Sequence, residues 1–334
     1  MSRSLNGIVI AEAGSVHDGS FGNACALVDM AAEAGADVVK FQTHIAAAET
    51  LRDAPQPTYF TGEPRFEYFE RTGFAFDQWL ALKRHCDARS IRFMSSPFSV
   101  EAVDLLEQIG ADIYKVPSGE VTNVFLLRRL VATRKPVILS SGMSNWAELD
   151  LAVAILRDCP ELVVLQCSSA YPCPPEQVGL NVLQEMRTRY EIPVGLSDHT
   201  LGSAAAFAAA ALGAKVIEKH TTFSRLMYGS DARHSMEPAE FRVFCSGLKD
   251  IWRMLENPVD KADLTPYLNM KRVFEKSLVT ARSLSAGHRI AQQDLAAKKP
   301  GDGIPTIEYE QVVGRKLLHA VPADHKLDWN DIAS

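Results

Sequence analysis

The sequence predicts an α/β fold: a (β/α)8 TIM barrel over residues 1–258, a linker over 259–276 and a small module over 277–334. Three observations favour this architecture. About eight short Val/Ile-rich runs alternate with segments of helical periodicity up to about residue 255. Nearly every run begins apolar and ends polar, and several helical segments end in glycine followed by alanine. The alternation is typical of parallel βα units.

The eight predicted strands follow one another with a helical segment between most neighbours. They are IVIAEAG from Ile8, DVVKFQT from Asp37, IRFMSSPFS from Ile91, DIYKVPSGE from Asp112, PVILSSG from Pro136, LVVLQCSS from Leu162, IPVGLSDH from Ile192 and KVIEKHT from Lys215. Gly35, Gly110 and Gly213 are placed to supply left-handed helix ends. A closed barrel is favoured over an open sheet because the polar strand ends then converge on its C-terminal face, where catalysis takes place in this fold.

Two regions depart from the simple repeat. The connection from His44 to about Phe76 is long and aromatic, with Tyr59, Phe60, Phe66, Tyr68 and Phe69. A loop of this length is usually a lid or an interaction segment; the alternative is that its aromatic rings pack on the barrel wall or at a subunit contact. The second region, from about Ser277, contains short runs broken by glycine and proline, which predict a module of short strands and turns.

Composition narrows the class of protein. The 334 residues are 47% hydrophobic, enough for a large core, and carry a net charge of -6 with lysine and arginine scattered along the chain. This charge argues against a nucleic-acid partner. No apolar stretch approaches the roughly 20 residues of a membrane span, and the six cysteines form no CxxC pair, so we expect a cytoplasmic protein with reduced thiols.

Two histidines occupy matching positions at the ends of consecutive runs, His199 in IPVGLSDHT and His220 in KVIEKHTT. Neighbouring strands of a barrel would bring both imidazoles to one rim, close enough to bind one metal ion. Two ligands leave positions for water and a substrate oxygen. We therefore expect a Lewis-acid site for Mn²⁺ or Mg²⁺, with Zn²⁺ as an alternative.

Two lysines, Lys40 and Lys115, follow buried runs and are expected to point into the barrel mouth. Hydroxyls lie near them at the strand ends: Ser95, Ser96, Ser118, Ser140, Ser141, Ser168, Ser169 and Ser197. Together these groups predict a phosphate or carboxylate pocket. A lysine at a strand end can also form a Schiff base, but a metal pair and a Schiff base are usually alternative ways to polarise a carbonyl.

Four carboxylates, Glu12, Glu120, Asp198 and Asp231, are placed to act as acid or base groups or as outer partners of a metal. The alternative for each is a surface salt bridge, most of all for Asp231, which lies in the loop YGSDARHSMEP. Glu120 is the strongest catalytic candidate because KVPSGE places it beside the predicted phosphate pocket.

Together these motifs resemble the sialic acid synthase family, with its legionaminate and pseudaminate synthases and the related spore-coat polysaccharide proteins. The matching segments are IAEAGSVHDGSF, ADVVKFQTH, FMSSPFSVEAVDLL, KVPSGEVTN, KPVILSSGM, LQCSSAYPCPPEQVGLN, GLSDHTLG, ALGAKVIEKHTT and GSDARHSMEP. They run through almost the whole barrel in order. The resemblance specifies the family far better than it specifies the sugar.

The resemblance implies condensation of phosphoenolpyruvate with an open-chain N-acetylated sugar such as N-acetylmannosamine or a deoxy relative, giving a nine-carbon 2-keto acid and phosphate. His199 and His220 would hold the metal, most readily Mn²⁺, with Mg²⁺ or Co²⁺ as alternatives. The implied substrate-binding and catalytic set is Lys40, Lys115, Ser118, Ser140, Ser197, Ser169 and Tyr171, with Glu12, Glu120 and Asp231 near the reacting groups or the sugar. C3 of phosphoenolpyruvate would attack the aldehyde, and water addition at C2 would precede loss of phosphate.

The segment from Ser277 resembles the antifreeze-like (SAF) domain of the family, which implies a homodimer in which this domain covers the partner's site. Lys299 stands where the family commonly has a sugar-contacting arginine, and lysine lacks the planar fork of arginine. Val16 and Asp18 also depart from the family's NHNG loop, which puts sugar choice in question. Competing interpretations are a phosphoenolpyruvate-dependent synthase acting on phosphorylated sugars and a catalytically silent barrel of polysaccharide assembly.

Overall fold

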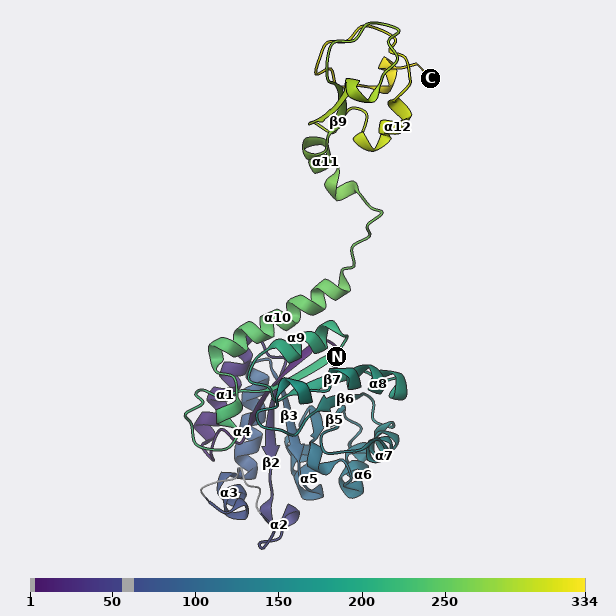
Figure 1. Cartoon of the computed structure of the whole chain (residues 1–334). Helices are drawn as coiled ribbons and strands as arrows, with labels where there is room; N and C mark the ends of the chain where they lie inside the picture. The colour runs from purple at the N-terminus through teal and green to yellow at the C-terminus, as the bar shows by residue number, and fades with distance from the viewer. Residues whose placement is uncertain (1–3, 56–62, 334) are drawn as a thin grey trace. The chain divides into compact units, whose positions relative to one another are not determined.

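The computed structural model describes residues 4–55 and 63–333 and divides into two units, residues 1–257 and 258–334. The first unit is a closed barrel of eight parallel strands in sequential order, surrounded by helices (Figure 1). This confirms the predicted TIM barrel. The strands are β1 Ile8–Gly14, β2 Val38–Thr43, β3 Arg92–Pro97, β4 Ile113–Val116, β5 Val137–Ser140, β6 Leu162–Cys167, β7 Val194–Asp198 and β8 Val216–His220.

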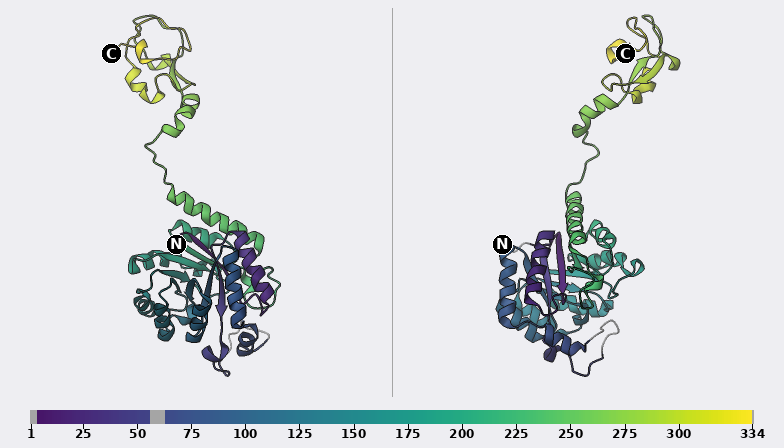
Figure 2. Two further views of the ribbon diagram at one scale, coloured as in Figure 1. Left: turned by 180° about the vertical axis from the view of Figure 1, so that it is seen from behind. Right: turned by 90° about the vertical axis from the view of Figure 1, so that its left-hand side faces the viewer.

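The helices of the barrel unit lie outside the strands in both further views (Figure 2). They are α1 Phe21–Ala34, α2 Ala46–Glu49, α3 Arg65–Thr72, α4 Phe76–Ala88, α5 Val100–Ile109, α6 Val124–Thr133, α7 Trp146–Leu156, α8 Leu180–Tyr190, α9 Ala204–Ala211 and α10 Pro238–Glu256, with 3-10 turns η1 Ser118–Glu120, η2 Pro175–Gln177 and η3 Ala232–His234. Gly35 and Gly110 end α1 and α5 in the left-handed conformation. Among the described helices, none combines the length and apolarity needed to cross a bilayer.

The long connection after β2 is more ordered than a plain loop. It contains α2 and α3, and Phe66, Tyr68 and Phe69 of α3 form a small buried cluster with Ala46 of α2. These three rings therefore pack within the connection itself, and both interpretations of the connection, a lid or interaction segment and packing on the barrel wall or at a subunit contact, stay predictions. The remaining predicted aromatics, Tyr59 and Phe60, fall outside the described residues.

The interior of the barrel is layered. Because side chains alternate along a strand, every second residue faces the lumen. The lower layers are apolar and fully buried: Ile8, Ile10, Val38, Met94, Ile113, Ile138, Val163, Leu165 and Val216. Two residues further along most strands, the next side chain that faces the lumen is polar. These side chains form a polar layer directly above the apolar layers.

The second unit has its own small core, formed by Leu278, Leu284, Ile290, Ile304, Val312, Leu317, Val321, Leu327 and Ile332. Its regular elements are α11 Leu268–Phe274, β9 Ser277–Thr280, β10 Leu295–Lys298 and α12 Tyr309–Val312, with 3-10 turns η4 Thr265–Tyr267, η5 Gln292–Asp294, η6 Thr306–Glu308 and η7 Trp329–Asp331. Strands β9 and β10 pair antiparallel. The segment 259–276, expected to be a linker, thus includes a 3-10 turn and helix α11.

Candidate active site

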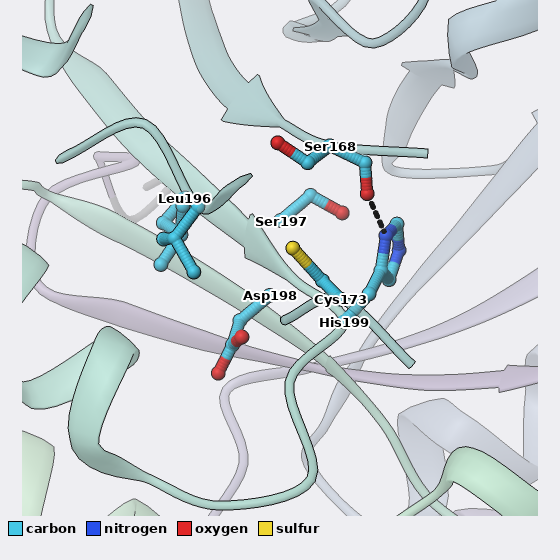
Figure 3. Close-up of a pocket in the computed structure, with 7 residues that line it drawn as sticks. Ser168, Cys173, Leu196, Ser197, Asp198 and His199 are labelled. Carbon is cyan, nitrogen blue, oxygen red and sulfur yellow. Dashed lines mark hydrogen bonds between the residues drawn. The ribbon is translucent and has the colours of Figure 1, made fainter. Parts of the chain in front are cut away.

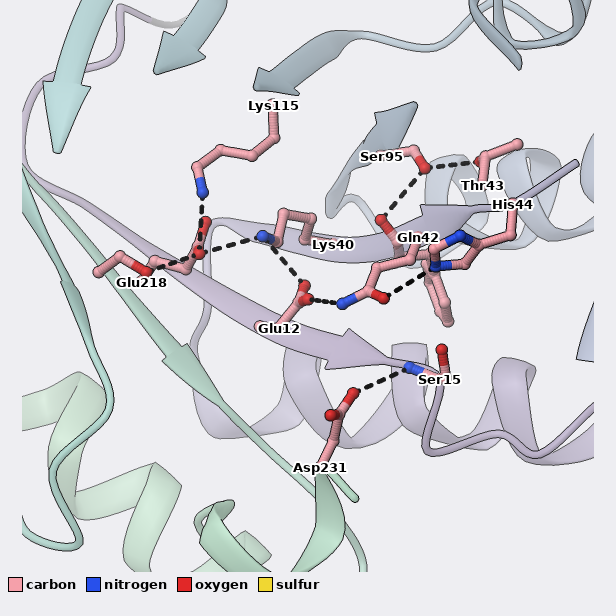
Figure 4. A network of polar contacts seen from close by, with 12 residues as sticks. Glu12, Ser15, Lys40, Gln42, Thr43, His44, Ser95, Lys115, Glu218 and Asp231 are labelled. Carbon is pink, nitrogen blue, oxygen red and sulfur yellow. Dashed lines mark hydrogen bonds and ion pairs between the residues drawn. The ribbon is translucent and has the colours of Figure 1, made fainter. Parts of the chain in front are cut away.

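Glu218 is the centre of a buried charge cluster in the polar layer (Figure 4). Its Oε1 lies 3.0 Å from Lys40 Nζ and 3.1 Å from Lys115 Nζ, and accepts a 3.0 Å hydrogen bond from Ser197 Oγ. The side chains of Lys115 and Glu218 are only 2% and 4% exposed. The two positive charges hold the pKa of Glu218 well below its ordinary value despite burial. The cluster therefore keeps two ammonium groups inside the barrel mouth, as predicted for Lys40 and Lys115.

Glu218 was not among the residues that the sequence indicated for the site. Its contacts come from β2, β4 and β7, which lie far apart in the sequence. A signal was nevertheless available, since Glu218 stands two residues before His220 and must share its face of β8.

Two further carboxylates, Glu12 and Asp231, lie beside the Glu218 cluster. Glu12 Oε2 is 3.4 Å from Lys40 Nζ, and Gln42 Nε2 donates a 2.8 Å hydrogen bond to Glu12 Oε1. Asp231 Oδ2 accepts from the backbone N–H of Ser15 at 3.4 Å. A Cβ at Gly14 would lie 2.5 Å from Asp231 Oδ2 and 3.5 Å from Glu12 Oε1, so this glycine gives both carboxylates room to approach β1.

Glu12 provides a prediction about pH and stability. Burial raises the pKa of Glu12 above its ordinary 4.5; the Lys40 charge opposes the shift and Glu218 adds to it. A raised folded-state pKa means that this group's contribution to stability is present at low pH and falls as the pH rises from about 4.5 through the raised value. We expect the free energy of unfolding of Glu12→Gln to rise relative to that of the wild type between about pH 5 and pH 8, as measured by urea unfolding. A pH-independent difference would contradict the assignment.

The two predicted metal ligands lie together at the mouth. The ring centroids of His199 and His220 are 5.5 Å apart. His199 Nδ1 donates to the Ser168 carbonyl oxygen at 2.9 Å, as Figure 3 shows, which leaves Nε2 for another partner. His220 Nδ1 is buried and has no hydrogen-bond partner in the described chain. Burial is the largest cause that lowers the pKa of His220; Asp231 opposes the shift, and His199 and Lys40 add to it. The His220 imidazole is therefore neutral, the form that binds metals. The donor set therefore fits a divalent ion.

The expectation for Asp198 is wrong. Alternation along β7 places Asp198 on the opposite face from Ser197 and His199, and Figure 3 shows Asp198 and His199 pointing in different directions. Its Oδ2 lies 2.8 Å from Lys219 Nζ, with both side chains 1% exposed. A small pocket at the end of β7 is lined by residues from both faces of the strand, Ser168, Cys173, Val178, Leu196, Ser197, Asp198 and His199. Asp198 is a buried ion-pair partner outside the polar layer.

Three predicted hydroxyls, Ser118, Ser140 and Ser169, lie at the ends of the neighbouring strands β4, β5 and β6. A Cβ at Gly142 would lie 2.4 Å from Ser118 Oγ and 2.5 Å from Ser169 Oγ, so both hydroxyls point at this backbone position. Ser140 Oγ, two residues earlier, is buried without a hydrogen-bond partner among the described residues. Ser118 also lies 3.5 Å from Cys167 Sγ. Of these three hydroxyls, Ser140 therefore offers a buried donor that the described residues leave unused.

Tyr171 and Glu120 occupy different edges of the mouth. The Tyr171 ring lies 4.2 Å from the His199 ring and 6.1 Å from the His220 ring, between centroids. Glu120, on η1, is half-buried and accepts a 2.7 Å hydrogen bond from Asn123 Nδ2. Burial raises the pKa of Glu120, and its nearest charged influences are Glu49 and Arg65 rather than the lysines. Glu120 therefore faces the α2–α3 connection.

A polar chain missed by sequence reasoning extends from Glu12 toward that connection. His44 Nε2 lies 3.1 Å from Gln42 Oε1, and His44 Nδ1 lies 2.7 Å from Glu49 Oε1. Its imidazole is stacked between Phe69 and Phe98, with centroid distances of 3.6 and 4.1 Å. His44 thus fixes the amide that Gln42 presents to Glu12.

Lys299 belongs to the second unit. It is exposed, and its ammonium lies 5.0 Å from the centroid of the Phe274 ring. This is the position at which the resemblance leads one to expect arginine.

Known proteins share both units of the chain. A family model described as the NeuB family matches residues 27–260. The chain belongs to the NeuB family. A model of the SAF domain matches residues 275–333, which confirms the predicted antifreeze-like domain of this NeuB family member.

Similar proteins are named synthases. The chain is 34% identical over 317 residues to the N,N'-diacetyllegionaminic acid synthase of Campylobacter jejuni, covering 92% of this chain and 95% of that protein. It is 32% identical to the human N-acetylneuraminate-9-phosphate synthase, covering 95% and 90%. A solved structure of N-acetylneuraminic acid synthetase from Leptospira borgpetersenii, in complex with citrate, superimposes with a TM-score of 0.70 at 29% identity, covering 79% of this chain and 90% of that chain. This NeuB family member is therefore an enzyme of the transferase type.

Proposed function

We propose that this enzyme condenses phosphoenolpyruvate with an open-chain N-acetylated hexosamine, N-acetylmannosamine or a deoxy relative, to give a nine-carbon 2-keto sugar acid and phosphate. The observation that carries the proposal is the pairing of two half-sites in one barrel mouth. Lys40 and Lys115, with the unpartnered hydroxyl of Ser140, would form an anion pocket, while His199 and His220 would form a metal pair. The relatives named N,N'-diacetyllegionaminic acid synthase and N-acetylneuraminate-9-phosphate synthase support the same reaction class.

The anion half would bind phosphoenolpyruvate. Lys40 and Lys115 neutralise its phosphate and carboxylate, and Ser118, Ser140 and Ser197 donate hydrogen bonds to their oxygens. Without an anion the ammonium groups are balanced by Glu218, so binding exchanges part of this buried ion pairing for contacts with the substrate. Phosphate held in this way is a better leaving group because the charge that develops on it is already compensated.

The metal half would bind the sugar aldehyde. His199 and His220 would hold a divalent ion, Mn²⁺ by preference and Mg²⁺ or Co²⁺ as alternatives, which as a Lewis acid polarises a carbonyl. Asp231 and Tyr171 border this half and are assigned to the sugar, together with Ser169.

Carbon–carbon bond formation joins C3 of phosphoenolpyruvate to the aldehyde carbon. Water then adds at C2, and the C2–O bond breaks as phosphate leaves. Glu12 is buried beside Lys40, and its raised pKa suits it to accept and return a proton during water addition. We assign Glu120, on the rim of the barrel mouth, to proton transfer on the acceptor sugar.

Ser140 gives a prediction for the anion half. Its buried hydroxyl has no protein partner in the described chain, so Ser140→Ala should leave stability nearly unchanged. Loss of a hydrogen bond to a charged oxygen should raise the KM for phosphoenolpyruvate about 10-fold or more. Ser95→Ala is the matched control, because Ser95 Oγ is bonded to Thr43 and to the Phe41 carbonyl; it should lower stability without changing this KM. Unchanged KM in Ser140→Ala would contradict the assignment.

The acceptor is tested by phosphate release from phosphoenolpyruvate and Mn²⁺ with a panel of N-acetylated hexosamines, their deoxy relatives, their 6-phosphates and non-acetylated phosphorylated aldoses. Release with unphosphorylated amino sugars supports the proposal. Release with only non-acetylated phosphorylated aldoses would support a 3-deoxy-ulosonate phosphate synthase instead, and no release with any acceptor would favour a silent barrel.

We also propose a cytoplasmic homodimer with exchanged SAF domains. Support comes from the exposed apolar side chains that follow α10 and continue through α11: Val259, Leu264, Tyr267, Leu268, Met270, Val273 and Phe274. Such a series is covered in most proteins by another surface. Light scattering should give twice the chain mass; a monomer at micromolar concentration would contradict the exchange. In the dimer, Lys299 would reach the partner's sugar site, where its single ammonium makes a less directional contact than arginine.

A further inference from the structure

The part of the second unit that matches the SAF domain, residues 275–333, is called the SAF unit below. It is built from two copies of one backbone pattern related by an approximate two-fold axis. Leu284 and Val321 exchange both backbone hydrogen bonds, each 2.9 Å long, as equivalent residues on such an axis must. Further backbone bonds occur in corresponding pairs: Thr280 to His325 and Leu317 to His288, Ala281 to Asp294 and Leu318 to Asp331, and Asp294 to Ala291 and Asp331 to Asp328. The chain thus offers an internal comparison between equivalent positions.

Each copy ends in a 3-10 turn held by an aspartate. Asp294 Oδ2 accepts from the Ala291 N–H at 2.9 Å, and Asp331 Oδ2 accepts from the Asp328 N–H at 2.8 Å. Six residues before each aspartate stands a histidine that contacts it through Nε2, His288 at 2.7 Å and His325 at 2.9 Å. These contacts are structural in both copies, since the turn needs its cap.

In each copy a third side chain also contacts the aspartate, and this side chain differs between the copies. In the first copy Arg282 contacts Asp294 Oδ1 with Nη2 at 2.7 Å, and Asp294 is fully buried. In the second copy the equivalent position is His319, whose Nε2 lies 2.9 Å from Asp331 Oδ1, and Asp331 is 11% exposed. Arginine can only donate, whereas imidazole can give up its proton and become a ligand.

The second copy therefore combines two imidazoles and a carboxylate. The ligand atoms of His319, His325 and Asp331 lie within 4.8 Å of one another, the one such group of three in the described residues. Although burial opposes ionisation, the Asp328 N–H and His325 hold the pKa of Asp331 below its ordinary value, so the carboxylate is charged. Two imidazoles and one carboxylate suit Zn²⁺ better than Mg²⁺ or Ca²⁺, which take oxygen ligands.

We propose that His319, His325 and Asp331 form a Zn²⁺ site in the SAF unit, separate from the barrel mouth, and that the Arg282, His288 and Asp294 group is its metal-free counterpart. Zinc would replace the imidazole protons that now face Asp331, with three protein ligands and a fourth position open to water or to a group from another molecule. This inference does not depend on the reaction of the barrel.

The test uses tag-free full-length protein with His199→Ala and His220→Ala, so that zinc binding in the barrel does not contribute. Calorimetric titration with Zn²⁺ should show one equivalent bound, and Co²⁺ should give visible d–d absorption. His319→Arg, which copies the Arg282 arrangement and keeps an ion pair with Asp331, should weaken binding by at least about 100-fold and abolish the absorption. A purely structural role for His319 would be preserved by arginine.

Arg282→Ala is the matched control in the other copy and should leave Zn²⁺ binding unchanged. If the barrel variant proves unstable, the loss of one equivalent between the wild type and His319→Arg gives the same information. Equal Zn²⁺ binding before and after His319→Arg would overturn the proposal. So would an equal loss in Arg282→Ala, because binding would then reflect the whole module rather than the three ligands.

Discussion

Replacing Lys115 with methionine is expected to reduce kcat/KM for phosphoenolpyruvate by about 1,000-fold or more. The Lys115 side chain is 2% exposed, and its ammonium lies 3.1 Å from Glu218 Oε1. We propose that this ammonium neutralises phosphate as the C2–O bond breaks. Methionine keeps most of the side-chain volume. Glu218 retains Lys40 at 3.0 Å and the Ser197 hydroxyl, so the remaining carboxylate is not left as an unpaired buried charge and the fold should persist.

The measurement is steady-state phosphate release, with circular dichroism to verify folding. Lys83→Met is the matched control, because Lys83 is also a shielded, ion-paired lysine but lies on α4, paired with Asp87 and Asp112. It should lose stability and keep kcat/KM. Wild-type turnover by folded Lys115→Met would remove Lys115 from the anion site.

Replacing His220 with alanine should abolish Mn²⁺ binding and lower phosphate release by at least about 100-fold. The reason is the buried, unpartnered Nδ1 and the neighbouring His199 ring, which together form the only ligand pair that the account assigns to the metal. Chelation of the wild type should produce a similar loss, reversed by added Mn²⁺.

One binding measurement and one control variant separate loss of the metal from loss of the fold. Phosphoenolpyruvate should still bind folded His220→Ala, because Lys40, Lys115 and Ser140 are unchanged. His85→Ala is a suitable control, since His85 pairs with Asp29 on the outer helices. Full activity of the chelated wild type would exclude a catalytic metal at this pair.

The barrel could be predicted from sequence because its signals are local. Each strand is a short apolar run, and Gly35 and Gly110 mark helix ends by a conformation that glycine adopts readily. The histidine pair was visible for the same reason: Asp198 pairs with Lys219, and His199 and His220 are the next residues on the two neighbouring strands' paths.

What the sequence left out depends on side-chain direction and on long-range contacts. Asp198 is adjacent to His199 in sequence, yet alternation turns it to the other face of β7, a step that the strand-end argument omitted. Glu218 and His44 acquire their roles from partners on other strands and helices. Glu120 follows β4 as expected, but a 3-10 turn aims it toward the α2–α3 connection.

We propose that one barrel mouth holds the metal half-site and the phosphoenolpyruvate half-site side by side. Crystals grown with Mn²⁺ and phosphoenolpyruvate can be measured at the manganese absorption edge to test this arrangement. We expect an anomalous peak between His199 and His220, and substrate density contacting Lys40, Lys115 and Ser140. Manganese away from the two histidines, or phosphoenolpyruvate bound outside the lysine pocket, would contradict it.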